Sequence, residues 1–452
     1  MASEGSPSSR GNTSSYAKDT SRITKENLFM VLALWMERFP VDQEEGQEEN
    51  PCYKKVGAVL VLPNDMLYAV DCTRNGVHGV ARLLMAHQDI LQDCKVFVSR
   101  KPCALCTKLL VQSKVKRVFY LPIEPEYYSN IEKYIQEHED MDEERKKKEK
   151  EEYERNFEEE TSCVDNLFKV SAIGQSVFVP KAGKEVLDDA EAKHETPEAI
   201  REVIKIRLMK TYWNENWMGK AKGKLPWPAF DDNMETQVRN DFEGVMEWMA
   251  RILVGTEKLE KEYNFKAVLS AQNENMPFNP EENSRERLQA QHLITLAKFL
   301  AERTDDPRIG VGAVIINKEK EIVALGWNGF PTKALYGEFP RASDRDKAVQ
   351  DKKYPYIIHA EQNALLMRNT KNIAGGTLFV TLTPCHDCIP LLEMHGIKTV
   401  VLGGNLGNET RGSLNYESFC GKVDAGVFIC FEMKSAGDSG GEPPTKKRKL
   451  DP

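Results

Sequence analysis

The chain has 452 residues, of which 40% are hydrophobic and 29% charged, a composition typical of globular proteins with two or three domains. Its net charge of −8 does not favour a general nucleic-acid binder, which usually presents a clear basic surface. The longest apolar runs, for example Leu28 to Trp35, are too short to span a bilayer.

The first segment, residues 1–21, is rich in Ser and Gly and lacks the apolar run of a secretory signal, so we expect it to be disordered. The chain contains ten cysteines. Without an export signal, these are expected to be thiols or metal ligands rather than a disulfide framework.

An internal repeat follows this segment. A helical stretch, Glu26 to Arg38, precedes the string KVGAVLVL at Lys55 to Leu62, and a similar stretch, Arg287 to Arg303, precedes GVGAVIIN at Gly310 to Asn317. In each copy a second strand, a histidine and a Pro-Cys-x-x-Cys string come next. The histidine lies 25 residues before the first cysteine in one copy and 26 in the other. The sequence therefore predicts two copies of one α/β unit.

The remaining segments interrupt or join these units. A dense Glu/Lys/Arg run near residues 135–162 is expected to be an exposed helix or a disordered loop within the first unit. Helical periodicity with Trp213, Trp217, Trp227 and Trp248 predicts a connector in which tryptophans are packing anchors. The predicted organisation is a first, degenerate unit at 22–182, a helical connector at 183–282, a second, catalytic unit at 283–434 and a disordered tail at 435–452.

The order of elements predicted for the second unit is helix, two strands, helix, strand, helix, strand, helix, strand. Short β-branched runs that alternate with helical stretches are typical of a three-layer α/β domain with a mostly parallel sheet. We therefore expect both units to be three-layer α/β/α domains.

Two strings of the second unit carry the candidate chemistry: YIIHAEQNALLMR from Tyr356 and TLTPCHDC from Thr381. His359, Cys385 and Cys388 offer one nitrogen and two thiolates, a set that suits a zinc ion with an open fourth position. Glu361 is expected to reach an activated water without being a ligand and to move its protons. The pattern H-x-E followed by P-C-x-x-C is the general signature of zinc deaminases.

A purely structural zinc site is the alternative for these residues. Such a site needs a fourth protein ligand and has no use for Glu361. His386 and His395 are the spare imidazoles nearby, and His386, between the cysteines, is poorly placed to close the site. Chance would give about 0.01 Pro-Cys-x-x-Cys strings in a chain of this composition, and two are present.

The first unit keeps the ligand pattern and lacks the proton shuttle. His78, Cys103 and Cys106 could hold a second, structural zinc ion, but Val80 stands where the second unit has Glu361. To restore the shuttle, a carboxylate such as Asp71 or Asp89 would have to enter the site from elsewhere in the unit. We expect the first unit to be chemically silent, with a structural or regulatory role.

The second unit resembles the cytidine and deoxycytidylate deaminase family over roughly residues 283–434. The resemblance rests on GVGAVIIN, GWNGFP from Gly326, KYPYIIHAEQNAL from Lys353 and TLTPCHDC. It implies a cytidine-deaminase-like fold with a five-stranded mixed sheet, and homo-oligomers. It further implies that Asn328 contacts the substrate sugar, that Ala360 and Thr383 border the base, and that Phe330 or Tyr356 packs near it.

Phosphate recognition favours guanidinium and ammonium groups. The cations of the loop before His359 are therefore candidate phosphate contacts: Arg341, Arg345, Lys352 and Lys353.

The function predicted first is that of a hydrolase: zinc-dependent deamination of free deoxycytidine nucleotides, dCMP or dCTP. An editing-type cytosine deaminase acting on DNA or RNA is the main alternative, and a non-catalytic scaffold is the third. The basic cluster Lys446, Lys447, Arg448 and Lys449 is typical of a nuclear-import signal, so nucleus and cytoplasm are the expected locations. A merely solvated tail is the other interpretation of this cluster.

Overall fold

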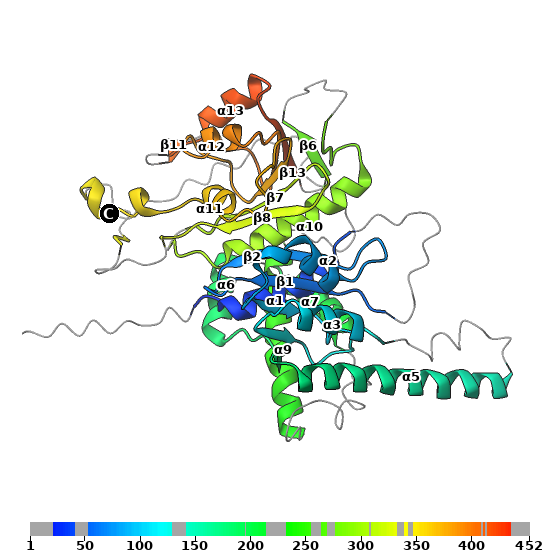
Figure 1. Cartoon of the computed structure of the whole chain (residues 1–452). Helices are drawn as coiled ribbons and strands as arrows, with labels where there is room; N and C mark the ends of the chain where they lie inside the picture. The colour runs from blue at the N-terminus through cyan, green and yellow to red at the C-terminus, as the bar shows by residue number, and fades with distance from the viewer. Residues whose placement is uncertain are drawn as a thin grey trace, which may run out of the picture.

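The structure is a computed structural model of the whole chain. It describes residues 21–40, 53–128, 142–194, 196–213, 232–254, 264–268, 276–306, 309–331, 339–341, 347–407, 410–411 and 414–434. Two sheets form the centres of two units, and the first unit lies below the second in Figure 1. In the described part of the chain, every helix is too short or too polar to cross a membrane.

The first sheet has five strands in the order β2-β1-β3-β4-β5. Strand β1 pairs antiparallel with both β2 and β3, whereas β3, β4 and β5 run parallel. The strands are β1 (Gly57–Val61), β2 (Leu67–Cys72), β3 (Lys95–Val98), β4 (Arg117–Tyr120) and β5 (Gly174–Val177). This is the five-stranded mixed sheet that the resemblance implied.

The second sheet repeats this order as β8-β7-β9-β10-β13 and adds a sixth strand, β6, at the edge. Strand β6 lies inside the segment expected to be wholly helical. It pairs antiparallel with β13, and its Phe265 is 1% exposed. Burial of this aromatic side chain at the edge of the sheet favours a strand over a helix at these residues. The strands are β6 (Asn264–Ala267), β7 (Gly312–Ile316), β8 (Ile322–Trp327), β9 (Thr377–Val380), β10 (Thr399–Leu402) and β13 (Ile429–Lys434).

Helices cover both faces of each sheet, as the α/β/α prediction required. Helix α1 (Lys25–Met36) lies on one face of the first sheet, and α2 (Gly79–Ala86) and α3 (Ala104–Gln112) cover the other. In the second unit α10 (Ser284–Ala301) takes the place of α1. The opposite face carries α11 (Ala360–Leu366), α12 (Ile389–Met394) and α13 (Glu417–Asp424).

Two equivalent glycines explain the repeated Gly-Ala-Val strings. A Cβ atom on Gly57 would lie 2.0 Å from the Ala33 carbonyl oxygen of α1, and one on Gly312 would lie 1.8 Å from the Ala297 carbonyl oxygen of α10. Only a residue without a side chain permits so close an approach of helix and strand. The glycines thus set the distance between α1 and β1 and between α10 and β7.

The two units meet through equivalent elements, α1 against α10 and β2 against β8, as the two halves of a symmetric dimer would (Figure 1). At the helix contact the Trp35 ring stacks on His292 with centroids 4.6 Å apart and meets Phe299 edge-on at 5.5 Å. Arg74 and Arg82 of the first unit pair with Glu321 of the second. One continuous apolar core includes α1, α10 and the inner faces of both sheets.

The connector contributes three helices, α6 (Lys184–Lys193), α7 (Glu198–Tyr212) and α9 (Asp232–Leu253). Helix α9 packs on α6, α7 and α10, and its Trp248 stacks on Phe299 of α10 at 5.7 Å. From α7, the Tyr212 hydroxyl donates to the Leu34 carbonyl of α1 at 2.7 Å. The connector therefore contacts both units. Trp217 and Trp227 lie outside the described residues.

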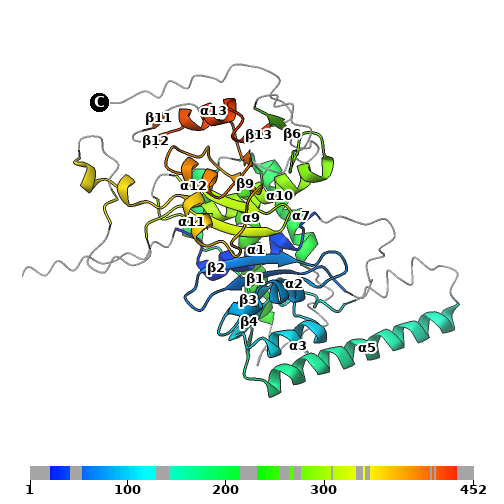
Figure 2. The same ribbon diagram turned by 45° about the horizontal axis from the view of Figure 1, so that its top comes forward.

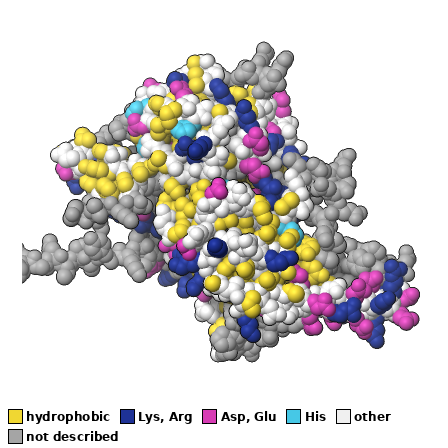
Figure 3. Space-filling model, in the orientation of Figure 1, with side chains coloured by type: hydrophobic (Ala, Val, Ile, Leu, Met, Phe, Trp, Pro, Cys, Tyr) yellow, Lys and Arg dark blue, Asp and Glu magenta, His cyan; other side chains and the backbone are white. Residues whose placement is uncertain are grey.

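The charged run forms a 28-residue helix, α5 (Glu143–Val170), which packs on α3 and projects beyond the first unit (Figure 2). Its far end carries charges of both signs (Figure 3). Only its other end has an apolar stripe, since Phe157, Val164 and Phe168 are at most 9% exposed. The remaining short elements are η1 (Gln88–Ile90), η2 (Val349–Asp351), η3 (Tyr354–Tyr356), β11 (Thr410–Arg411) and β12 (Leu414–Asn415).

Candidate active site

The second unit brings its three candidate ligands together at two helix N-termini. His359 is the N-cap of α11, while Cys385 follows β9 and Cys388 is the N-cap of α12. The His359 Nδ1 atom lies 3.2 Å from the Cys385 sulfur and 3.3 Å from the Cys388 sulfur, and the two sulfurs are 3.9 Å apart. Zinc bonds of about 2.0–2.3 Å in tetrahedral geometry separate ligand atoms by roughly 3.3–3.8 Å, so this set fits the ion.

The surroundings of Cys385 favour its thiolate, whereas the hydrogen bond with Cys385 and burial raise the pKa of Cys388 well above its ordinary value. A hydrogen bond from the Cys388 thiol, together with the neighbouring His359, lowers the pKa of Cys385 to about 4. A thiolate is the form in which cysteine binds a metal. Among the described residues, the metal-binding group here contains His359, Cys385 and Cys388 and no fourth member. His386 and Asp387, which are exposed, form a different group with the buried Cys385.

Glu361 lies beside this group without belonging to it. It is the second residue of α11 and is 4% exposed. Burial raises the pKa of Glu361 to about 7, and the charges of His359 and Cys385 and a hydrogen bond with Cys388 also act on it. A carboxyl group with a pKa near neutrality can both accept and return a proton at pH 7.

Residues expected around the substrate are mostly engaged in the local structure. The Asn328 side chain accepts from the Val311 N–H at 2.8 Å and donates to the Ile309 carbonyl at 2.9 Å, so it fixes the turn before β7. The Thr383 hydroxyl accepts from the Gly407 N–H at 2.8 Å. Ala360 is fully buried at the start of α11. The sugar contact predicted for Asn328 would need its remaining amide hydrogen or a rearranged turn.

The two predicted aromatic residues belong to one cluster. Phe339 links them, with ring centroids 5.9 Å from Phe330 and 5.6 Å from Tyr356. The Arg341 guanidinium lies over the Phe330 ring at 5.3 Å. Phe339 was not among the residues predicted from the sequence, and its only signal was its place in the same loop.

The predicted phosphate contacts separate into three groups. Lys353 does not fit the prediction, because its side chain is 3% exposed and its ammonium group pairs with Asp306. Burial beside a carboxylate turned this cation inward. Arg341 and Lys352 lie in the described loop next to the aromatic cluster and η2, and Arg345 lies outside the described residues, as does the basic cluster of the tail.

The first unit also brings its histidine and two cysteines together, and a carboxylate that was not predicted from the sequence joins them. This carboxylate is Glu126, from the loop after β4. The two carboxylates considered from the sequence lie elsewhere: Asp71 pairs with Arg74 and Arg82, and Asp89 lies on the exposed η1 turn. The sequence feature that could have indicated Glu126 is its position just beyond the carboxyl end of a parallel strand, because ligands of α/β sheets bind at that edge.

Comparison with known proteins decides the family of the second unit. Residues 287–404 match the family model described as the cytidine and deoxycytidylate deaminase zinc-binding region. The second unit is a cytidine and deoxycytidylate deaminase domain. The match, the buried ligand set and Glu361 agree on deamination of a nucleotide base as the general chemistry of this domain.

Relatives match the chain to different extents. Cytidine and dCMP deaminase domain-containing protein 1 of Danio rerio is 27% identical over 440 residues, which cover 88% of this chain and 87% of that protein. The deoxycytidylate deaminase of Homo sapiens is 36% identical over 111 residues, or 25% of this chain and 62% of that enzyme. A solved structure of dCMP deaminase from cyanophage S-TIM5, in complex with dCMP and dUMP, is 29% identical over 24% of this chain and 76% of its own, with a TM-score of 0.21.

Proposed function

We propose that the second unit hydrolyses free deoxycytidine nucleotides, dCMP or dCTP, to the deoxyuridine nucleotide and ammonia. The observation that carries the proposal is a buried carboxyl group, Glu361, beside a three-member His/Cys/Cys group. In this proposal His359, Cys385 and Cys388 hold one zinc ion, which supplies Lewis-acid activation of water.

The proposed proton transfers all use Glu361. Its carboxylate takes a proton from the attacking water and delivers it to the ring nitrogen next to the amino-bearing carbon. It then passes the second proton of that water to the departing amino group, which leaves as ammonia. The pKa of about 7 supports both directions of transfer near neutral pH.

The nucleotide substrate is proposed on two grounds. Matched relatives in vertebrates are named deoxycytidylate deaminase, and those in fly and worm "probable deoxycytidylate deaminase", at 36–39% identity over their matched regions. The net charge of −8 also disfavours a polyanionic nucleic acid as substrate. Arg341 and Lys352 are the phosphate contacts we propose, next to the aromatic cluster of Phe330, Phe339 and Tyr356 that would border the base.

One assay tests the substrate class. Purified full-length protein would be incubated with cytidine, dCMP, dCTP and a cytosine-bearing oligonucleotide, and the uracil product of each measured. We expect product from a deoxynucleotide, and none from the matched variant Glu361→Gln. Product from the oligonucleotide alone would establish the editing-type alternative, and no product from any substrate in zinc-loaded protein would establish the scaffold.

We also propose that the protein is nuclear as well as cytoplasmic and that it forms homo-oligomers. The basic cluster Lys446 to Lys449 supports import, and the homo-oligomer rests on the family resemblance alone. Replacing the four basic residues with alanine should move a fluorescent fusion out of the nucleus. An unchanged distribution would mean that the tail is only solvated.

A further inference from the structure

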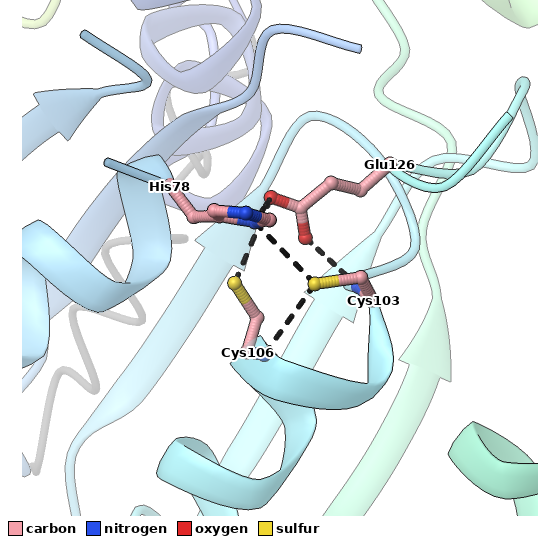
Figure 4. Close-up of side chains that lie close together, drawn as sticks. All are labelled: His78, Cys103, Cys106 and Glu126. Carbon is pink, nitrogen blue, oxygen red and sulfur yellow. Dashed lines mark hydrogen bonds and ion pairs between the residues drawn. The ribbon is translucent and has the colours of Figure 1, made fainter. Parts of the chain in front are cut away.

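The first unit contains a buried cluster of four metal-ligating side chains (Figure 4). His78 is the N-cap of α2, Cys103 is the N-cap of α3, Cys106 lies in the first turn of α3, and Glu126 follows β4. One ligand atom from each lies within 4.8 Å of the other three. Cys103, Cys106 and Glu126 are each at most 1% exposed. The N-termini of α2 and α3 and the loop after β4 therefore bring their side chains to one place.

The separations within the cluster suit a tetrahedral ion. The His78 Nδ1 atom is 2.8 Å from Glu126 Oε1 and 3.4 Å from the Cys103 sulfur, and the Cys106 sulfur is 3.6 Å from Glu126 Oε1. Tetrahedral zinc separates its ligand atoms by roughly 3.3–3.8 Å. Small outward shifts would therefore admit the ion between all four side chains.

The position of Glu126 is set by its own backbone and by α3. Its N–H donates to the Lys101 carbonyl at 2.9 Å, and its carbonyl accepts from the Lys54 N–H at 2.7 Å. The second carboxylate oxygen, Oε2, accepts from the Cys103 N–H at 2.8 Å. This last bond holds the carboxylate so that Oε1 faces the histidine and Cys106. Orientation by a second hydrogen bond is common for carboxylates that bind metals.

Charge gives a further reason for an ion. A buried carboxylate is costly unless it is paired, and in the described part of the chain the ion pair of Glu126 is with His78, itself a metal-ligand type. In the metal-bound form the two cysteines would be thiolates, so the site would carry the charges of two thiolates and one carboxylate. A divalent cation at the centre offsets most of that charge, as in structural zinc sites.

A nucleotide is a poorer occupant of this region. The pocket beside the cluster is lined mainly by apolar side chains, and its lysine, Lys101, pairs with Asp165 at 2.6 Å. The Ala104 N–H at the start of α3 donates to Glu160 of α5 at 2.6 Å, so a carboxylate of α5 also lines the pocket. These carboxylates would repel a phosphate group.

We propose that His78, Cys103, Cys106 and Glu126 bind zinc as a closed structural site, in which Glu126 fills the coordination position that a catalytic site leaves to water. No position then remains for a reacting water, and Val80, which is fully buried, offers no proton shuttle. The ion joins α2, α3 and the loop after β4. This proposal concerns the first unit and does not depend on the activity of the second.

Zinc content tests the site in the full-length chain. We expect two zinc ions per wild-type chain and one in Cys388→Ser, which removes a ligand of the second unit only. In the Cys388→Ser background, X-ray absorption at the zinc edge should give two sulfur and two nitrogen or oxygen neighbours. A Cys388→Ser chain that folds but holds no zinc would overturn the proposal.

Substitution of the carboxylate tests the closure. In the same background, Glu126→Gln should raise the zinc dissociation constant about tenfold or more, since even the loss of a group that only hydrogen-bonds to a ligand lowers metal affinity about 10–100-fold. Cobalt in that variant should change its visible spectrum when azide is added, because a position has opened; cobalt in the parent should not respond.

The matched control is Glu160→Gln, whose carboxylate bonds to α3 but lies outside the ligand set. It should leave zinc affinity and the cobalt spectrum unchanged. If the parent's cobalt already responds to azide, or if Glu126→Gln has parental affinity and spectrum, Glu126 is not a ligand. Should Glu126→Gln fail to fold, the azide response and zinc-edge spectrum of the parent still decide the matter.

Discussion

The two units carry the same three ligand types at equivalent helix N-termini, and they differ in where the carboxylate comes from. In the second unit Glu361 follows His359 on the same helix and lies outside the ligand group. In the first unit the equivalent residue is Val80, and the carboxylate comes from Glu126, inside the group. In our two proposals, this change in the source of the carboxylate separates a site that leaves a coordination position to water from one that protein fills.

This difference extends to what surrounds each site. The first unit places α5 over α3, so that Glu160 and the apolar residues of α5 cover the region. The second unit has the short helix α13 and the β11–β12 hairpin in its corresponding stretch. In the first unit α5 thus packs over the region of the cluster, whereas the corresponding stretch of the second unit contains no long helix among its described residues.

The largest effect is expected from matched substitutions of the two carboxylates. Glu361→Gln should lower turnover by about 10²–10⁴-fold, because general acid–base catalysis is worth that much, while zinc content stays at the wild-type level. Glu126→Gln should leave turnover per folded molecule within about twofold, since it lies in the other unit. Steady-state deamination and zinc analysis of both variants measure the contrast.

Two results would contradict these expectations. Loss of zinc from the second unit of Glu361→Gln would mean that this glutamate stabilises the metal site and does not act mainly in proton transfer. Loss of turnover in well-folded, zinc-loaded Glu126→Gln would mean that the first unit regulates the second.

The next effect concerns the boundary between the units. Trp35 is 4% exposed, stacks on His292 and donates from its ring nitrogen to the His292 carbonyl at 3.1 Å. Trp35→Ala should destabilise the protein by about 3–5 kcal/mol, the usual cost of removing a large buried aromatic group. Because one apolar core includes both inner sheet faces, denaturant should unfold wild type in one transition. Two separate wild-type transitions would show that the units fold independently.

The repeated glycines provide a test in which the units should behave alike. Gly57→Ala and Gly312→Ala each bring a methyl group against a helix carbonyl, and overpacking of this kind costs about 1–3 kcal/mol or more. Urea unfolding of both variants measures the loss. The control is Gly421→Ala in α13, where the added methyl meets nothing within 4 Å and should stabilise the helix by up to about 1 kcal/mol. Tolerance at only one of the two glycines would show that the units are packed differently.

Much of the fold could be predicted because the same sequence pattern occurs twice in the chain. Each copy supports the helices and strands predicted for the other. The α/β order of the second unit and the gathering of His359, Cys385 and Cys388 followed from periodicity and ligand spacing. Strand β6 was missed because four residues in a long helical segment carry almost no periodic signal, and its pairing with β13 is decided by the sheet edge.

The rest depended on tertiary contacts that no local pattern contains. Glu126 lies 20 residues beyond Cys106, and only the parallel packing of β3 and β4 brings its loop back to α3. Lys353 has the composition of a surface cation, yet Asp306, from the turn after α10, draws it inward. Side-chain direction in loops was therefore the part of the site that the sequence could not predict.

One pair of equivalent positions in α1 and α10 differs by a titratable side chain. Ala33 of α1 and Ala297 of α10 are equivalent, because each contacts the glycine at the start of the neighbouring strand. Five residues before these alanines, α1 has Leu28 and α10 has His292, so these two residues are counterparts. Burial, and then the nearby Arg38 charge, lowers the pKa of His292 well below its usual value. The unfolded chain binds a proton near pH 6.5, so below that pH it binds more protons than the folded chain and stability falls.

His292→Leu, which installs the residue of the first unit, should therefore flatten the acid limb of the stability curve. Between pH 6.5 and pH 5.5 wild type should lose about 1 kcal/mol more than the variant, since one pH unit is worth about 1.4 kcal/mol for a single group. Urea unfolding at pH 7.5, 6.5 and 5.5 measures the difference. Cysteine and carboxylate protonation affects both proteins alike and cancels. Parallel curves would mean that His292 accepts its proton within the folded interface.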